Sequence, residues 1–242
     1  MNGKITISEE IDAFENEWRV LLNECQNFCF ATRAKEFQAQ AREKLKELEA
    51  KAQTLKKKAV SYEVEDSANK LLSFQEIINA ISNELSMWIA LKDDDAGLAW
   101  DCLVNAQMAV KTAMQAHSVA SHLDNYSSHL SILEHHLFPK QMFASPGMII
   151  KEARCSICKQ EYGECDHLVG KPYMGEICVR EIVHVDLKEF SLVEKPANKH
   201  ARVTSFTDEE GVHRDFLTWR PAIKATPNTK GNKKDSKKPL IM

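Results

Sequence analysis

Three cysteines and one histidine between residues 155 and 167 have the types and spacing of a metal site. Cys155 and Cys158 form a C-x2-C pair, and Cys165 and His167 follow as a C-x-H pair. Three thiolates and one imidazole complete the tetrahedral ligand set that Zn²⁺ prefers. Because protein side chains fill all four positions, no position is left open for water or substrate. The sequence therefore predicts a structural zinc ion rather than a catalytic one.

The chain has seven cysteines, an odd number that does not fit a disulfide framework. Cys178 lies close enough in sequence to replace His167 as the fourth ligand, or to be a buried thiol beside the site, and the spacing leaves both readings open. Cys25, Cys29 and Cys102 lie in helical sequence and are interpreted as small apolar packing residues. Free thiols and a metal site fit a reducing compartment.

Composition narrows the class of protein. At 242 residues, with 43% hydrophobic and 28% charged side chains, the chain has room for one or two domains with an apolar core. A net charge of −3 gives no overall attraction to nucleic acid or to an anionic membrane. No apolar run approaches the roughly 20 residues of a membrane span, and no signal peptide opens the sequence. We expect a cytoplasmic protein without membrane contact.

Glycine and proline divide the chain. No proline precedes Pro139, and Gly97 is the only glycine between Gly3 and Gly147. Both residues disfavour helix interiors, so this distribution predicts a helical first part and a turn-rich second part. The expected divisions are a helical coiled-coil or bundle domain at 1–138, an extended connector at 139–150, a zinc-binding β module at 151–222 and a disordered basic tail at 223–242.

Apolar residues three and four positions apart predict long helices in the first part. A first helix begins near Thr6 and Glu9, which have capping-box spacing, and carries apolar seams at 11–28 and 34–55. Further helices are predicted at about 64–92, 96–121 and 125–137. The fold class is therefore mainly α, a long antiparallel coiled coil or bundle of three to four helices.

Short β-like runs follow the cysteine cluster. They lie at 178–185, 189–193 and 201–206 and are separated by turn residues such as Pro196 and Asn198. A small sheet beside the metal loop is the natural arrangement. A module of this size has little core, so we expect it to depend on the metal for stability.

The segment 187–203, LKEFSLVEKPANKHARV, resembles the EVSLV-x-x-PAN-x-x-A-x-V segment of the phage head-maturation (prohead) protease family. This resemblance implies that Ser191 is a nucleophile, with His184, His200 or His213 as its base. That family has a β-rich body before the serine, whereas this chain has long helices and a metal loop. We therefore interpret the segment as a strand-and-turn unit kept for its fold.

These observations favour a non-enzymatic, zinc-stabilised interaction or scaffold protein. Its helices would mediate self-association or docking of a protein partner, and the resemblance implies a phage or anti-phage defence setting. One alternative is a serine peptidase with Ser191 as nucleophile. A second is a nucleic-acid-binding accessory protein that uses the six lysines between Lys224 and Lys238.

Overall fold

The computed structural model of the chain describes residues 6–222 and 240–241. The chain forms two compact units. Of the described residues, the first unit contains 6–137 and 167–178, and the second contains 138–166, 179–222 and 240–241. The lysine-rich stretch 224–238, for which the sequence predicts a disordered tail and contact with nucleic acid, lies outside the described residues.

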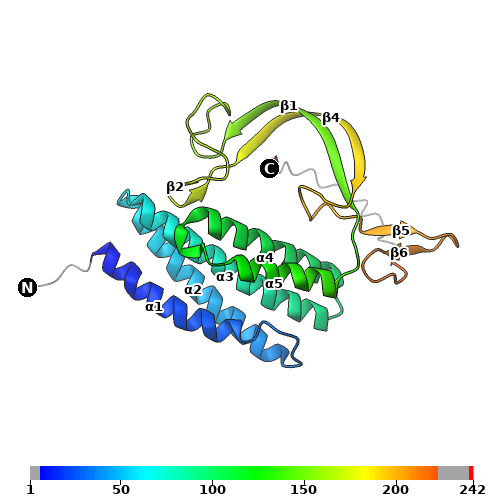
Figure 1. Ribbon diagram of the computed structural model, residues 1–242, viewed down its shortest axis with the longest axis horizontal. Helices are drawn as coiled ribbons and strands as arrows, with labels where there is room; N and C mark the ends of the chain where they lie inside the picture. The colour runs from blue at the N-terminus through cyan, green and yellow to red at the C-terminus, as the bar shows by residue number, and fades with distance from the viewer. Residues whose placement is uncertain (1–5, 223–239, 242) are drawn as a thin grey trace, which may run out of the picture. The chain divides into compact units, whose positions relative to one another are not determined.

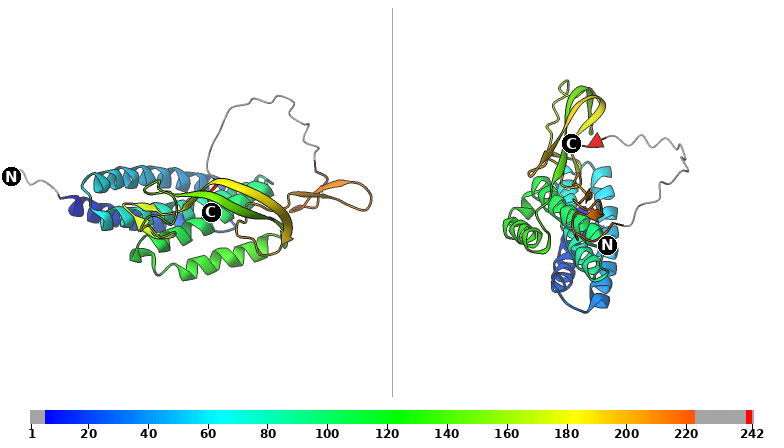
Figure 2. Two further views of the ribbon diagram at one scale, coloured as in Figure 1. Left: turned by 90° about the horizontal axis from the view of Figure 1, so that it is seen from above. Right: turned by 90° about the vertical axis from the view of Figure 1, so that its right-hand side faces the viewer.

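Five α-helices form the first unit, and helices that follow one another in the chain pack side by side (Figures 1 and 2). A long coiled coil is not observed, because α3 buries most of its circumference, including five consecutive residues at 71–75. A coiled-coil seam would bury about two positions in seven. None of the described helices is long and apolar enough to cross a membrane. The helices are α1 (Ile7–Gln26), α2 (Lys35–Ser61), α3 (Glu65–Lys92), α4 (Ala96–Ala116) and α5 (Asp124–Leu137).

The expected first helix is interrupted, which corrects the sequence-based expectation. The chain leaves helical geometry between α1 and α2, although no glycine or proline lies there. The fully buried Gln38 amide stabilises the break by donating to the carbonyl oxygens of Phe28 at 2.8 Å and Phe30 at 3.1 Å. Lys92 of α3 donates to the Gln38 carbonyl oxygen. A buried amide with these partners replaces the missing helical hydrogen bonds.

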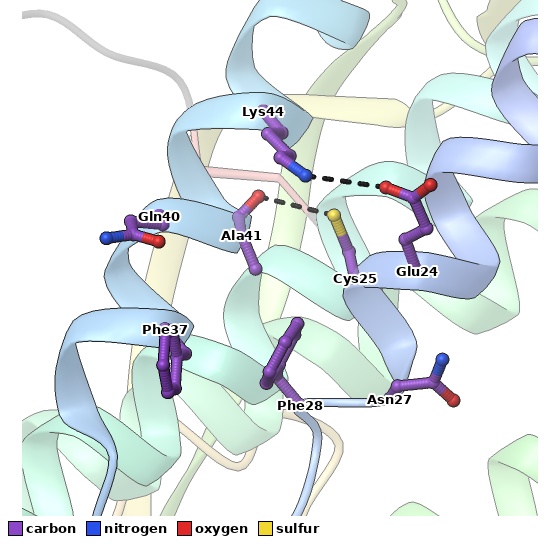
Figure 3. Close-up of a pocket in the computed structure, with 8 residues that line it drawn as sticks. All are labelled: Glu24, Cys25, Asn27, Phe28, Phe37, Gln40, Ala41 and Lys44. Carbon is purple, nitrogen blue, oxygen red and sulfur yellow. Dashed lines mark hydrogen bonds and ion pairs between the residues drawn. The ribbon is translucent and has the colours of Figure 1, made fainter.

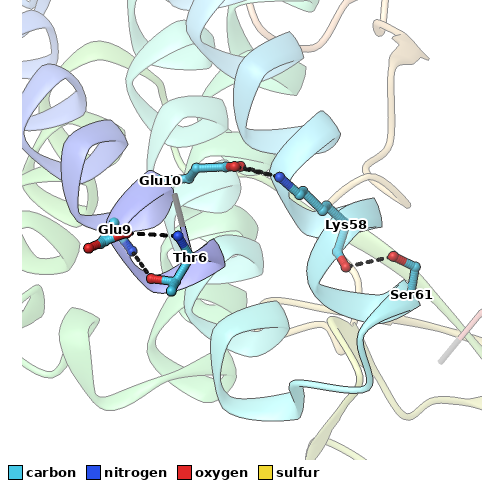
Figure 4. A network of polar contacts seen from close by, with 5 residues as sticks. All are labelled: Thr6, Glu9, Glu10, Lys58 and Ser61. Atoms are coloured by element: carbon cyan, nitrogen blue, oxygen red, sulfur yellow. Dashed lines mark hydrogen bonds and ion pairs between the residues drawn. The ribbon is translucent and has the colours of Figure 1, made fainter. Parts of the chain in front are cut away.

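The predicted start of α1 is confirmed (Figure 4). The Thr6 hydroxyl accepts from the Glu9 backbone N–H at 3.4 Å, and the Thr6 N–H donates to the Glu9 carboxylate at 2.7 Å. This capping box satisfies donors that have no partner inside the helix. Lys58 of α2 pairs with Glu10 at 2.6 Å, so the first turn of α1 is also tied to its neighbour.

An aromatic cluster joins α1 to α3 in the core of the helical unit. Phe74 of α3 is completely buried. Its ring centroid lies 4.5 Å from that of Trp18 and 6.1 Å from that of Phe14, both on α1. Tilted aromatic pairs at such distances add to the large apolar area that each ring buries. Phe74 therefore holds α1 against the rest of the bundle.

The second unit is built on a long, curved ribbon of two strands (Figure 1). A two-residue strand, Leu240–Ile241, pairs with one end of this ribbon and makes a three-stranded sheet. Strand β1 (Phe143–Cys155) pairs antiparallel with β4 (Arg180–Val193). The strands expected at 178–185 and 189–193 are therefore parts of one strand, and its partner β1 includes much of the expected connector. The smaller strands are β2 (Pro172–Tyr173), β3 (Glu176–Ile177), β5 (Ser205–Thr207), β6 (His213–Asp215) and β7 (Leu240–Ile241).

Candidate metal centre

Cys155, Cys158, Cys165 and His167 come together. One ligand atom from each of them lies within 4.8 Å of all the others. A zinc ion with about 2.3 Å bonds to sulfur would bring tetrahedral ligands to separations of about 3.8 Å, so only a small contraction is needed. The four side chains lie close enough to bind a metal ion. Cys178, the alternative fourth ligand, does not belong to this group.

The first cysteine pair is shaped by the tight turn that follows β1. The Cys155 N–H donates to the Gln160 carbonyl at 2.9 Å, and the Lys159 N–H donates to the Cys155 carbonyl at 2.9 Å. Lys159 has a positive φ of 63°, which closes the turn. The Ile157 N–H points at the Cys155 sulfur at 3.4 Å. Such N–H groups stabilise the negative charge of a metal-bound thiolate.

His167 supplies independent support for a ligand at this site. Its Nδ1 atom is buried and has no hydrogen-bond partner among the described residues. The ring packs edge-on against Tyr173, with the centroids 4.6 Å apart, and the Tyr173 hydroxyl accepts from the Leu168 N–H at 2.9 Å. A buried imidazole nitrogen without a partner is costly unless another group takes its lone pair or its proton. A metal ion would do this.

The β2–β3 turn, which follows His167, is seated on α2 and α3 within the first unit. The buried N–H of Gly175 donates to the Asn69 side-chain oxygen at 2.8 Å, and the Met174 N–H donates to the Glu65 carboxylate at 3.3 Å. The Lys56 ammonium donates to the Gly175 carbonyl at 3.3 Å. Sequence reasoning missed these contacts, because nothing near Asn69 marks it as the acceptor for a turn more than 100 residues away.

Replacing Gly175 by Ala is expected to lower the free energy of unfolding by about 2–3 kcal/mol. Gly175 has a φ of +79°, and an added Cβ would lie 3.2 Å from the Ala68 carbonyl oxygen. Gly211→Ala is the matched control, because Gly211 has the same φ but nothing within 4 Å of an added Cβ. Urea denaturation should give a clearly larger loss for Gly175→Ala. Equal losses would mean that the docking contact contributes nothing.

A cavity of about 320 Å³ lies between the end of α1 and the start of α2 (Figure 3). Glu24 and Lys44 pair across its rim at 3.4 Å, and the buried Cys25 thiol donates to the Ala41 carbonyl at 3.5 Å. Burial raises the pKa of Cys25, so its thiol stays protonated. A buried, protonated Cys25 thiol is not an activated nucleophile. The lining residues are Glu24, Cys25, Asn27, Phe28, Phe37, Gln40, Ala41 and Lys44.

A second polar cluster surrounds Glu84, which is completely buried on α3. The Tyr126 hydroxyl donates to it at 2.6 Å, and His129 Nε2 lies 3.1 Å from its other oxygen. Burial raises the pKa of Tyr126 and the pKa of Cys29, and the nearby Glu84 carboxylate raises both further. The Cys29 thiol also donates a hydrogen bond to Glu84. The cluster therefore ties α5 and the chain after α1 to α3, and it keeps Cys29 protonated instead of nucleophilic.

Ser191, the residue that matches the protease nucleophile, lies exposed on β4 opposite Ser145. His184 is on the same strand seven residues away, which corresponds to about 23 Å in an extended chain. This separation excludes a hydrogen-bonded pair of Ser191 and His184. His213 lies on β6, and His200 follows the turn at Asn198.

Comparisons with known proteins found no matching protein family, no matching curated protein and no matching solved structure. The feature that indicates a specific chemistry is the convergence of three thiols and one imidazole, which could bind a metal ion.

Proposed function

We propose that this chain is a non-enzymatic interaction protein whose segment 155–178 is held in shape by a structural Zn²⁺ ion. The proposal rests on Cys155, Cys158, Cys165 and His167, whose ligand atoms lie within 4.8 Å of one another. Thiolate and imidazole donors select zinc over Mg²⁺ or Ca²⁺, which take oxygen ligands. Four protein ligands leave no place for a reacting water, so the ion would stabilise the fold.

The second unit has a reason to depend on such an ion. A sheet of two long strands and one two-residue strand is marginally stable in water unless enough apolar side chains are buried with it. Few apolar residues of this unit are buried in the part of the chain that the structure describes. They are Phe138, Phe143, Ala153, Cys155, Ile182 and Leu217. A core this thin supports a fold in which binding of the ion supplies much of the folding free energy.

The surroundings of the nucleophiles support a non-enzymatic role. Burial raises the pKa of the thiols of Cys25, Cys29 and Cys102, which is the opposite of what a catalytic cysteine needs. Ser191 lies on the open surface of a strand, too far from His184 for that histidine to take its proton. An interaction role, in the phage or anti-phage setting that the resemblance implies, needs no activated group.

Two measurements test the proposal. Elemental analysis of protein purified without added metal should find about one zinc per chain. After chelation, hydrogen exchange should rise sharply at 143–193 while α2, α3 and α4 stay protected. Absence of a transition metal, or exchange that chelation leaves unchanged, contradicts a structural ion. Peptidase activity that disappears in Ser191→Ala would contradict the non-enzymatic role.

A further inference from the structure

The β1–β4 ribbon has two faces of very different chemistry. Residues paired across an antiparallel ladder point to the same side, and alternate residues along a strand share a side. On one face the paired residues are all apolar. They are Ala144 with Leu192, Pro146 with Phe190, Met148 with Leu187, and Ile150 with Val185. We call these eight residues the apolar face.

A β-bulge at Lys188 creates this face. The pairing passes from Gly147 with Glu189 to Met148 with Leu187, so Lys188 is an extra residue on β4. Without the extra residue, strict alternation would place Leu187 on the opposite side from Phe190. The opposite face is mixed, because it pairs Phe143 with Val193, Ser145 with Ser191, Gly147 with Glu189, and Ile149 with Asp186.

Three side chains of the apolar face are largely exposed. Leu187, Phe190 and Leu192 are 57%, 70% and 66% exposed. The large exposed apolar side chains of the described helices are scattered over α1, α2, α4 and α5, whereas these three lie within six residues of one strand. A contiguous exposed apolar patch of this kind marks an interaction site.

We infer that the apolar face is the interface through which two copies of this chain associate. None of its eight residues is charged, so the surface that covers it must also be uncharged and apolar. A two-fold axis meets this requirement, because it packs the apolar face of one copy against the same face of the second copy. Two ribbons packed face to face would form a small β-sandwich, the usual way in which apolar sheet faces are buried.

The area fits a weak dimer. The three most exposed side chains contribute roughly 400 Å², and their neighbours raise the face to on the order of 500 Å² per copy. The pair then buries on the order of 1,000 Å² in total, the lower limit for a specific interface. We therefore expect weak, concentration-dependent association. The inference rests on the proposed function and names the partner for it.

Sedimentation velocity over a range of concentrations tests the inference on the full chain, with zinc content and unfolding midpoint measured on each sample. Wild-type protein should shift from monomer to dimer, and Phe190→Ser combined with Leu192→Ser should raise the dissociation constant at least about tenfold. Ser191→Ala is the matched control, because its side chain points from the same strand to the opposite face.

The outcomes separate this inference from the proposed function. Zinc-loaded wild-type protein that sediments as a monomer at every concentration overturns the dimer and leaves the metal proposal standing. A dimer whose dissociation constant is the same in the wild type and in the double variant also overturns the assignment of the interface to the apolar face. Protein without metal contradicts the proposed function itself, whatever its association state.

Discussion

Cys155→Ser is expected to abolish stoichiometric metal binding and to lower the free energy of unfolding of the second unit by about 3–5 kcal/mol. Cys155 is completely buried at the end of β1, and its sulfur accepts the Ile157 N–H. A serine hydroxyl is a poor zinc ligand, so the substitution leaves only three protein ligands. Without the ion, the buried imidazole nitrogen among them has no partner within the described part of the chain. Elemental analysis and urea denaturation measure the two effects.

Cys178→Ser is the matched control for this prediction. Cys178 is also completely buried, but it lies outside the group of converging ligand atoms. The same change of sulfur to oxygen should therefore destabilise the chain modestly and leave the metal content near one ion per chain. Loss of metal in Cys178→Ser, together with retention in Cys155→Ser, would show that the ligand set is assigned wrongly.

Phe74→Ala is expected to cost about 3–5 kcal/mol and to loosen α1 from the bundle. Phe74 is fully buried and contacts both Phe14 and Trp18, so its truncation leaves a cavity between α1 and α3. Urea denaturation followed by circular dichroism gives the loss of stability. Hydrogen exchange should show the largest loss of protection in α1.

Phe37→Ala removes the same atoms from a site that is 53% exposed and should cost less than about 1 kcal/mol. The difference between the two variants measures the contribution of burial, since the chemistry of the substitution is identical. Similar losses in both would mean that Phe74 does not hold α1 in the way its ring contacts indicate.

Several features of this protein follow from short-range sequence patterns. Spacing alone identified the four side chains that converge, because a turn and an adjacent C-x-H pair bring ligands together within thirteen residues. The start of α1 was predicted from Thr6 and Glu9, whose hydrogen bonds span three residues. The concentration of proline and glycine after residue 138 likewise predicted where long helices end.

Other features depend on contacts between residues far apart in the chain, which no local pattern encodes. The sequence favoured His167 as the fourth ligand and left Cys178 as an alternative, and the folded loop brings His167, not Cys178, into the group. The break between α1 and α2 needs the buried Gln38 and its partner Lys92, 54 residues away. The burial of Glu84 depends on Tyr126 of α5, 42 residues away, which donates to its carboxylate.

The β1–β4 ribbon combines features that local sequence predicts with features that depend on long-range pairing. Much of β4 was recognised as strand sequence, but residues 143–150 of its partner strand β1 were interpreted as a connector. The pairing of β1 with β4 closes a loop of 24 residues, which no local pattern predicts. The side to which Leu187 points depends on the bulge at Lys188, which exists only in the register with β1. Local spacing thus identified the converging side chains and most of the helical segments. Strand register, a tertiary property, decided which face of the ribbon is apolar.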